Sequence, residues 1–459
     1  MKQLRASKDG ARPRRRWRTG PAVLVAAAFA AVPLAAPGAA LAASRTTSAS
    51  SSSQSLTIWT DSARLPMVKL YAKDHPKVKV NIVTFDGGAN GDGSIEAKVA
   101  LFNRIGHGWP DIIFSEEAND VQTLAEPQFD NFAAVLNNGL VPQSVLNNYA
   151  TGALSPCMVG GKLECLRNDM AFDVLWVNVP LMKQWGYAVP QTWQQWQAIG
   201  ESVAKNHPGY IIGTAGDSFD DHLYLQAAQC PIDDILNTYQ VLDNPSDGHC
   251  TRIGNLLDPL VKDGSVPPVY VFSSTFGKQY ANKTLMLIGA AWYSGAIFEG
   301  SGSSFNAPKG TWAAYPPLAW GSSTAQAYTG DVGGGLWIMS SHAANPQLAA
   351  SAMVWLATST PSQDLSQGYP GYVPAAKSWI AEQDASGFFA SPLAPTFAKA
   401  VGEVWSGYAE SPWNTSTIWS ATALPDLTSG QSFSSQIPLV ATQISDAASL
   451  AGFQVLSKP

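Results

Sequence analysis

The apolar pattern between residues 56 and 114 alternates between the spacing of β-strands and that of α-helices. Short apolar or alternating runs, typical of strands, lie at 56–59, 78–84 and 110–114, and apolar residues recur at helical intervals over 65–72 and 95–105. Strands that alternate with helices in this order form a largely parallel sheet with right-handed crossovers. The sequence therefore predicts an α/β fold.

Polar side chains follow each of the three predicted strands. They are Thr60, Asp61, Asp86, Glu116 and Glu117. Because ligands bind beyond the carboxyl ends of the strands in such sheets, we expect these residues to face a binding cleft. Thr60 and Asp61 have a competing role as the N-cap of a helix that starts near Ser62. Of the two glutamates, we expect one to face the cleft and the other to be a solvated charge.

The loop after Asp86 shares some residues with a calcium-binding loop. Glycine stands at the sixth place, Gly91, as calcium loops require, but the twelfth place is Ala97, where such loops have Glu. We therefore interpret the segment 86–93 as a ligand-side loop or the approach to a helix. We expect neither a metal ion nor a cofactor.

Residues 1–43 have the features of an export signal. Four Arg lie within 14–18, an apolar Ala-rich run occupies 23–36, and Ala40-Leu41-Ala42 has the small-x-small pattern of a cleavage site. The apolar run is shorter than the roughly 20 residues that a membrane span needs. The stretch 44–55 is rich in Ser and Thr, which is typical of a flexible linker. We expect a secreted or surface-associated protein.

Removal of the predicted signal changes the charge balance. The whole chain has a net charge of −6, but residues 1–43 hold eight Lys and Arg and one Asp, which leaves 20 basic and 33 acidic residues and a net charge near −13. No basic stripe remains, which argues against nucleic-acid partners and anionic membrane surfaces. The roughly 400 remaining residues exceed one hydrophobic core, so we expect two lobes.

Four cysteines are present, and an even number in an exported chain indicates two disulfides. Of the three possible connectivities we favour Cys157–Cys165 and Cys230–Cys250, because the members of each pair are close in sequence. Gly160-Gly161 has the composition of a hairpin turn between the first pair. A cysteine metal site is not expected, since there is no paired C-x-x-C spacing.

Five segments occur in an order that resembles a known family. They are the opening with YAKDHPKVKV and GWPDIIF, then VGGKLECLRNDMAFDVLWVNVPLMKQWGYAVPQTWQQW, KTLMLIGAAWYSG, GTWAAYPPL, and GGGLWIMSSHAANPQLAASAMVWLATS. Together they resemble the extracellular solute-binding proteins of family 1, the group that contains the maltose-binding proteins. The resemblance covers most of residues 56–380. Many relatives carry a lipidated Cys directly after the signal, whereas this chain has no Cys before Cys157.

The resemblance implies a two-lobed periplasmic-binding-protein fold of type II. In that fold each lobe is a mixed or parallel sheet flanked by helices, with a hinged cleft between the lobes. We place the chain crossings near Ala171, Gly333 and Gly368, which assigns 56–171 with 335–368 to lobe 1 and 172–334 with 369–459 to lobe 2. Gly333, Gly334 and Gly335 suit a hinge because glycine absorbs torsion changes, although a tight turn before a strand explains them equally well.

The resemblance also implies which residues hold the ligand. Trp292 matches the family's stacking tryptophan, and Asp169 matches an acidic position that often holds sugar hydroxyls. Core packing is the competing role for Trp292, and a hairpin end is the competing role for Asp169. Further candidates near the expected crossings or on loops are Tyr293, Gly334, Tyr369, Tyr372 and Trp413.

From this resemblance we expect the substrate-binding subunit of a carbohydrate ABC importer, and not an enzyme. It is expected to act as a monomer, to capture a sugar by hinge closure and to deliver it to membrane permeases. A sensor or adhesion module of the same fold is the alternative, because fold does not fix function. A secreted glycoside hydrolase is a further alternative, and it would need two carboxylates across the scissile bond. The chain lacks the G-x-S-x-G and H-E-x-x-H motifs.

Overall fold

The computed structural model of the protein describes residues 54–88, 93–299, 305, 307–407 and 411–458. The predicted export signal, nearly all of the predicted linker, and residues 89–92 of the calcium-like loop lie outside these described residues. Within them, no helix is both long enough and apolar enough to cross a lipid bilayer. The linker was expected to reach residue 55, but Ser55 already pairs with Lys79 as the first residue of a strand.

The first sheet has five strands and contains the three strands that the N-terminal pattern predicts. Its order is β2 (Lys79–Thr84), β1 (Ser55–Thr60), β3 (Ile112–Ser115), β13 (Leu336–Met339) and β6 (Leu166–Arg167). β1 pairs in parallel with β2 and β3, so that Ile58 lies beside Ile82 and Ile112. β13 comes from far along the chain and pairs antiparallel with β3. The parallel core therefore carries three strand ends at one edge.

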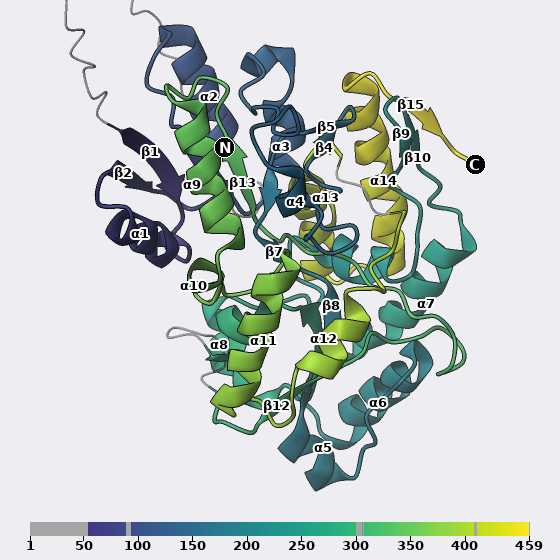
Figure 1. Ribbon diagram of the computed structural model, residues 1–459. Coiled ribbons are helices and arrows are strands. Elements are labelled where there is room, and N and C mark those ends of the chain that lie inside the picture. The colour runs from purple at the N-terminus through teal and green to yellow at the C-terminus, as the bar shows by residue number, and fades with distance from the viewer. Residues whose placement is uncertain (1–53, 89–92, 300–304, 306, 408–410, 459) are drawn as a thin grey trace, which may run out of the picture. The chain divides into compact units, whose positions relative to one another are not determined.

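Helices cover this sheet, and two of them, α1 and α2, lie where the apolar spacing predicts helices (Figure 1). They include α1 (Leu65–Asp74), α2 (Ser94–Ile105), α3 (Asp120–Leu124), α4 (Gln143–Leu146), α9 (Pro346–Thr358) and α10 (Thr360–Gln363). α1 ends at His75, directly before Pro76, and buries Met67, Val68 and Tyr71 on one face. α1 packs against α9, which continues from the return strand β13. The predicted helices at 65–72 and 95–105 are confirmed.

The second sheet is built around one fully buried strand. Its order is β11 (Met286–Ala290), β8 (Asp173–Asn178) and β12 (Trp312–Tyr315). Both pairings are antiparallel, because β11 and β12 each begin beside the carboxyl end of β8. This differs from the mixed or parallel sheet that we expected in each lobe. Trp176 donates its indole N–H to the carbonyl of Gly289, 3.1 Å away, which ties β8 to β11.

The remaining elements lie outside the two sheets, and all of them except β4 and β5 follow β8 along the chain. They are α5 (Val179–Trp185), α6 (Trp193–Asn206), α7 (Gly248–Asp263), α8 (Ser274–Gln279), α11 (Val373–Ser386), α12 (Ala394–Ala400), and the small strand pairs β4 (Met158–Val159) with β5 (Lys162–Leu163) and β9 (Asp234–Asn237) with β10 (Gln240–Leu242). α6 starts after Thr192, whose hydroxyl accepts the N–H of Gln195. This cap explains why the helix begins at Trp193.

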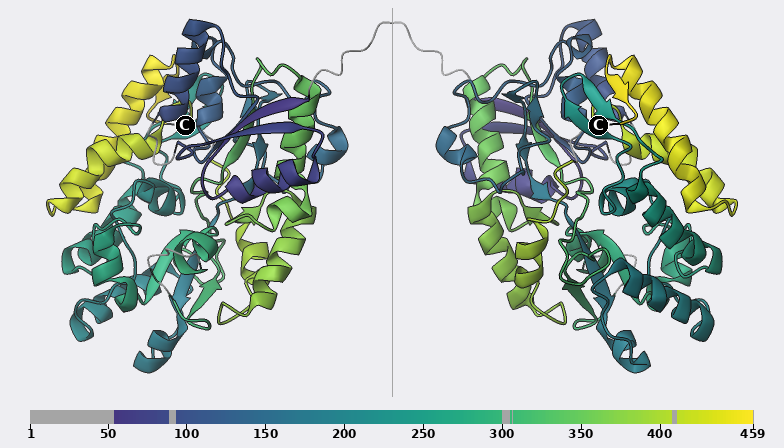
Figure 2. Two further views of the ribbon diagram at one scale, coloured as in Figure 1. Left: turned by 90° about the vertical axis from the view of Figure 1, so that its left-hand side faces the viewer. Right: turned by 90° about the vertical axis from the view of Figure 1, so that its right-hand side faces the viewer.

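The C-terminal segment consists of α13 (Thr415–Thr428), α14 (Phe433–Leu450) and β15 (Gln454–Leu456). α14 packs against α7 and α13, and β15 pairs in parallel with β10. Figure 2 shows the yellow α14 beside the teal helices of the middle of the chain.

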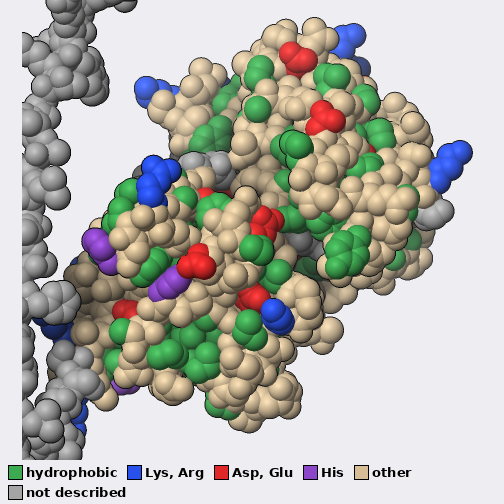
Figure 3. Space-filling view, turned by 90° about the horizontal axis from the view of Figure 1, so that it is seen from above, with side chains coloured by type: hydrophobic (Ala, Val, Ile, Leu, Met, Phe, Trp, Pro, Cys, Tyr) green, Lys and Arg blue, Asp and Glu red, His purple; other side chains and the backbone are tan. Residues whose placement is uncertain are grey.

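On the face drawn in Figure 3, the described Lys and Arg side chains lie apart and form no continuous basic patch.

Three chain passages run side by side between the two sheets. β7 (Asp169–Met170) pairs antiparallel with β14 (Tyr369–Pro370), and Phe172 bridges to Asp331. The backbone N–H of Val332 donates to the carbonyl of Ala171. These passages coincide with the crossings expected near Ala171, Gly333 and Gly368. The lobe boundaries that we derived from those crossings stay a proposal.

Two disulfides are present, Cys157–Cys165 and Cys230–Cys250, the pairs expected from their spacing. Gly160 and Gly161 form the turn between β4 and β5, with φ of 55° and 81°. Positive φ is adopted easily by glycine alone. The Cys157–Cys165 bond therefore closes a short loop around this hairpin.

Replacing Cys157 and Cys165 together by Ala is expected to lower the free energy of unfolding by about 2.5 kcal/mol, because the unfolded chain regains the freedom of the eight-residue loop. Urea unfolding measures this value. A reducing agent that opens both disulfides serves as the control, and it should destabilise the wild type more than the double variant, which has only Cys230–Cys250 to lose. A loss below about 0.5 kcal/mol would show that the loop is equally ordered without the bond.

Candidate functional site

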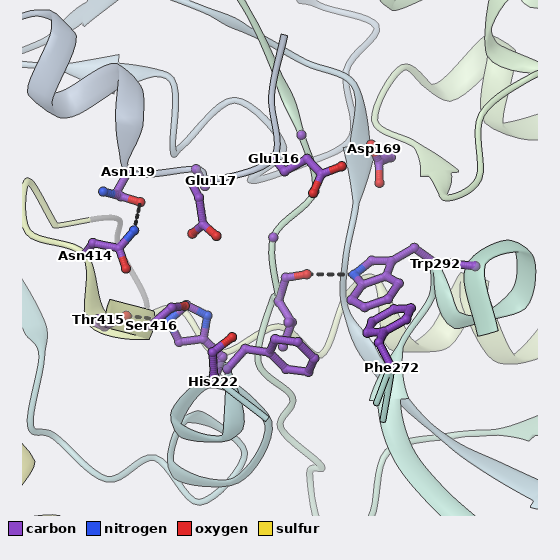
Figure 4. A pocket seen from close by; sticks show the side chains of 18 of the residues that line it. Glu116, Glu117, Asn119, Asp169, His222, Phe272, Trp292, Asn414, Thr415 and Ser416 are labelled. Atoms are coloured by element: carbon purple, nitrogen blue, oxygen red, sulfur yellow. Dashed lines mark hydrogen bonds between the residues drawn. The ribbon is translucent and has the colours of Figure 1, made fainter. Parts of the chain in front are cut away.

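The structure contains a cavity of about 470 Å³ (Figure 4). It is lined by residues that follow strands of the two sheets, by residues of the three chain passages, and by residues at the start of α13. This volume lies within the range of small-molecule sites, about 300–1,000 Å³. Its walls are formed by Arg64, 116–119, Asp169, Ser218, Phe219, His222, Tyr270, Phe272, Trp292, Ala296, 332–335, Gln367 and 413–416. Each wall has a distinct chemistry.

One wall is acidic and comes from the end of β3 and from β7. Glu116 and Glu117 follow β3 directly, and the chain turns there because the Ser115 hydroxyl accepts the backbone N–H of Glu117 at 3.0 Å. Asp169 belongs to β7 and is 1% exposed. The structure thus brings Glu116, Glu117 and Asp169 to one cavity, although Asp169 comes about 50 residues after the two glutamates in the sequence. All three were among the residues that the sequence singled out.

Arg64 holds this acidic wall together. Its guanidinium lies 2.9 Å from Asp61, 3.3 Å from Glu116 and 3.7 Å from Asp169, measured between nitrogen and carboxylate oxygen. It also lies over the ring of Phe114, 4.5 Å from the centroid. Arg64 was not among the residues predicted from the sequence, because its partners come from three separate segments. Its place one turn after a strand-ending Asp was the available signal.

Asp61 serves the turn that leads into α1 and does not line the cavity. Its side chain accepts the backbone N–H of Arg64 at 2.7 Å and binds the guanidinium of the same residue. This is similar to the helix-capping role that the sequence offered for Asp61 as the alternative to ligand binding. Thr60 is fully buried and also lies outside the cavity. Asp86 is exposed and accepts hydrogen bonds from Gly88 N and Ser94 Oγ within its own loop.

Burial and charge crowding change the protonation of the acidic wall. Burial raises the pKa of the Glu116 carboxyl to about 8, although the positive charge of Arg64 opposes the rise. Asp61 and Glu117 add to the rise through their negative charges. The Oδ2 atom of Asp169 is buried and has no hydrogen-bond partner among the described residues. The wall therefore presents acceptors that a ligand can use.

The opposite wall is aromatic. Trp292 stacks with Phe272, with ring centroids 6.0 Å apart and planes inclined by 11°, and Phe219 meets Trp292 edge-on at 6.0 Å. Trp292 donates its indole N–H to the carbonyl of Val332 at 2.8 Å, which fixes the orientation of the ring. Phe272 keeps 40% of its surface exposed. The aromatic faces are thus held in place at the cavity.

Gly289 explains how the chain places Trp292. A Cβ atom at Gly289 would overlap the ring of Tyr293, so only glycine lets that ring fold back against the strand. Tyr293 is 1% exposed and lies beneath Trp292, with 4.7 Å between their rings. Tyr293 therefore packs in the core, whereas Trp292 lines the cavity.

The third wall comes from the start of α13 and a π-helical segment at Asp221–Gln226. His222 shares a 2.9 Å hydrogen bond with the Thr415 hydroxyl, and Asn414 donates to the side chain of Asn119 at 3.2 Å. Trp413 is held by a 3.0 Å bond from its indole N–H to Asp233. Apart from Trp413, the sequence did not single out these residues, since they lie on loops without a recognisable motif.

The candidates near the expected chain crossings divide between the cavity and the core. Gly334 lines the cavity. Tyr369 packs against Phe172 and Phe397, and Tyr372 packs against Tyr149, so neither tyrosine lines the cavity. Among the described residues, no group of three or more His, Cys, Asp or Glu is arranged to hold a metal ion.

Comparison with known families gives one match over most of the chain. The sequence profile described as bacterial extracellular solute-binding protein matches residues 56–362. No curated protein is similar enough in sequence to count as a match.

Several solved structures share the fold. The galacto-N-biose-/lacto-N-biose I-binding protein of the ABC transporter from Bifidobacterium longum, in complex with lacto-N-biose, has 17% identity and a TM-score of 0.72 over 88% of this chain and 98% of that one. The ABC transporter associated binding protein from B. animalis subsp. lactis Bl-04, in complex with β-1,6-galactobiose, has 17% identity and a TM-score of 0.70 over 88% and 99%. The sugar-binding protein MalE from Xanthomonas citri has 13% identity and a TM-score of 0.64 over 86% and 98%. The predicted two-lobed binding-protein fold is confirmed.

Proposed function

Because the chain belongs to the family of bacterial extracellular solute-binding proteins, we propose that it is the carbohydrate-binding subunit of an ABC importer. The solved structures of the same fold support this function, since two of them are described as binding proteins of ABC transporters with a bound disaccharide. In this role the protein acts as a monomer outside the cytoplasm and passes the bound sugar to membrane permeases.

The observation that carries the proposal is the pairing of an aromatic wall with an acidic wall across one cavity. A sugar presents hydroxyl groups at its edge and C–H groups on its faces. Trp292 and Phe272 offer flat apolar surfaces to the C–H faces. Glu116, Glu117 and Asp169 offer oxygen atoms that accept hydrogen bonds from hydroxyls. The aromatic wall thus suits the C–H faces of a sugar, and the acidic wall suits its hydroxyl groups.

Hinge closure is the mechanism that this arrangement supports. The cavity is lined by residues from β3, from β11 and its following turn, and from the chain passages that connect the two sheets. Asn414 donates a hydrogen bond to the side chain of Asn119, and the carbonyl of Pro412 accepts one from the hydroxyl of Thr123, so the segment before α13 is joined to α3 beside the cavity. A sugar that contacts both sides would favour the closed arrangement over the open one.

Substituting Trp292 with Ala is expected to weaken sugar binding by about 2 kcal/mol or more, roughly 30-fold, because truncation of a stacked Trp at a binding centre has effects of this size. A thermal-shift screen with mono- and oligosaccharides identifies the ligand, which at about 100 times its Kd should stabilise the wild type by about 2.7 kcal/mol. Calorimetry then compares the variant with the wild type.

Trp185→Ala is the matched control. Trp185 is half-buried on α5 and stacks on His207, away from the cavity, so its loss should lower stability without changing affinity. Turnover of the bound sugar would favour a hydrolase over a binding protein. A protein that binds no carbohydrate would contradict the proposed function.

A further inference from the structure

The charges that line the cavity do not balance. Three carboxyl groups, those of Glu116, Glu117 and Asp169, line it together with the guanidinium of Arg64 and the imidazole of His222, and no lysine is among the described lining residues. Arg64 is also shared with Asp61, which lies outside the cavity and at 2.9 Å is the shortest of its three ion pairs. The described lining therefore has an excess of negative charge, even before the acidic character of the chain is considered.

This excess of negative charge is partly buried, where charge costs free energy. Asp169 is 1% exposed, and its distance of 3.7 Å from Arg64 makes this the longest ion pair of the cluster. Its Oδ2 atom accepts no hydrogen bond from any described residue. Burial, together with the neighbouring Asp61 and Glu117, raises the pKa of Glu116 to about 8, so at pH 6.5 this carboxyl is mostly protonated and the negative charge lies on Asp61, Glu117 and Asp169. Several carboxylates that crowd one guanidinium are unfavourable where water is scarce, and a further cation relieves them.

The wall opposite these carboxylates is suited to a cation as well as to a sugar face. Aromatic rings attract positive charge to their faces, and the attraction grows when the site excludes water. Trp292 and Phe272 stand nearly parallel, the hydrogen bond to Val332 fixes the ring of Trp292, and Phe219 meets Trp292 edge-on. In Figure 4, Glu116 and Asp169 are drawn above this aromatic pair. A positive group held between the two walls would satisfy both.

We propose that the ligand of this cavity is a carbohydrate that carries a protonated amine, such as an amino sugar or an oligosaccharide that contains one. This inference rests on the proposed function and narrows its ligand class. A neutral sugar can donate hydrogen bonds to the carboxylates but leaves their charge uncompensated. An ammonium group does both, and charge-assisted hydrogen bonds are about twice as strong as neutral ones. N-acetylation removes the charge, so an N-acetylated sugar is predicted to bind as a neutral sugar does.

Matched sets of saccharides test the inference. Each set keeps one ring and one linkage and changes only the group at C2: glucose, N-acetylglucosamine and glucosamine, the galactose equivalents, and the β-1,4-linked disaccharides cellobiose, di-N-acetylchitobiose and its deacetylated form. Binding is measured by calorimetry at pH 6.5, where the amines are protonated. In at least one set the amine is expected to bind about tenfold tighter than both neutral members.

Isosteric neutralisation of the acidic wall separates charge from shape. Glu117→Gln and Asp169→Asn are each expected to reduce the ratio of amine affinity to neutral affinity by several-fold, because the amide keeps the size but not the charge. Glu382→Gln is the control, since Glu382 is exposed on α11, does not line the cavity, and changes the net charge by the same amount. It should leave the ratio unchanged.

The outcomes are distinct. Neutral sugars that bind as tightly as their amines would overturn the inference and leave the carbohydrate-binding function standing. An amine preference that survives in both Glu117→Gln and Asp169→Asn would also overturn it, because the charge would then come from elsewhere. A protein that binds no member of any set would count against both the inference and the proposed function.

Discussion

Substitution of Arg167 by Met is expected to lower the free energy of unfolding by about 3–5 kcal/mol, because it leaves a buried carboxylate without its partner. Arg167 is 0% exposed and lies 3.0 Å from Asp331, which is 4% exposed. The same guanidinium donates to the carbonyls of Gly333 and Asp169, each at 2.8 Å. One side chain therefore joins the first chain passage to the second, and its loss affects both.

Urea unfolding with an unchanged m-value measures this effect. The double variant Arg167→Met with Asp331→Leu removes both charges and is expected to regain part of the lost stability, since two apolar groups replace an ion pair at little cost. Lys399→Met is the matched control. Lys399 is 56% exposed and lies 3.7 Å from Glu403 on the next turn, so breaking that pair should cost under about 0.5 kcal/mol. Equal losses for Arg167→Met and Lys399→Met would contradict the prediction.

The N-terminal half of the first sheet could be predicted from the sequence because its signals are local. β1 and β3 are apolar runs that end in polar residues, and the apolar spacing of α1 and α2 is helical. The chain passages could not be predicted as strands by pattern, since β6, β7 and β14 have two residues each. The antiparallel direction of β11 and β12 could not be predicted either. It depends on where the long, mostly helical segment between β8 and β11 returns the chain to the sheet.

The residues of the candidate site also divide into those that had a local sequence signal and those that had none. Glu116, Glu117 and Trp292 line the cavity, and each carried a local signal, either a strand end or a family motif. Arg64 and His222 carried none, because their roles arise from segments that meet only in the folded chain. The sequence favoured Trp292 over its neighbour Tyr293, and the burial of Tyr293 shows that it is a core residue.

Substitution of Gly334 by Ala is expected to destabilise the protein by about 2–5 kcal/mol and to weaken ligand binding. Two costs add: about 1–2 kcal/mol for a non-glycine residue at positive φ, and about 1–3 kcal/mol for overpacking. The φ angle of Gly334 is +82°, and an added Cβ would fall on the Arg167 guanidinium and lie 2.5 Å from the carbonyl oxygen of Asp169. The side chains that would have to move include the ones that join the chain passages and line the cavity.

Gly333 provides the control that separates these two costs. Its φ is +80°, nearly the same as that of Gly334, but an added Cβ would lie 3.5 Å from the carbonyl oxygen of Glu116, which is an ordinary contact. Gly333→Ala should therefore show only the cost of positive φ, about 1–2 kcal/mol, and should change affinity less. If the two variants lose equal stability and equal affinity, the close approach of Gly334 to Arg167 has no energetic consequence. If Gly334→Ala alone loses affinity, the hinge and the binding cavity share the space that this glycine leaves open.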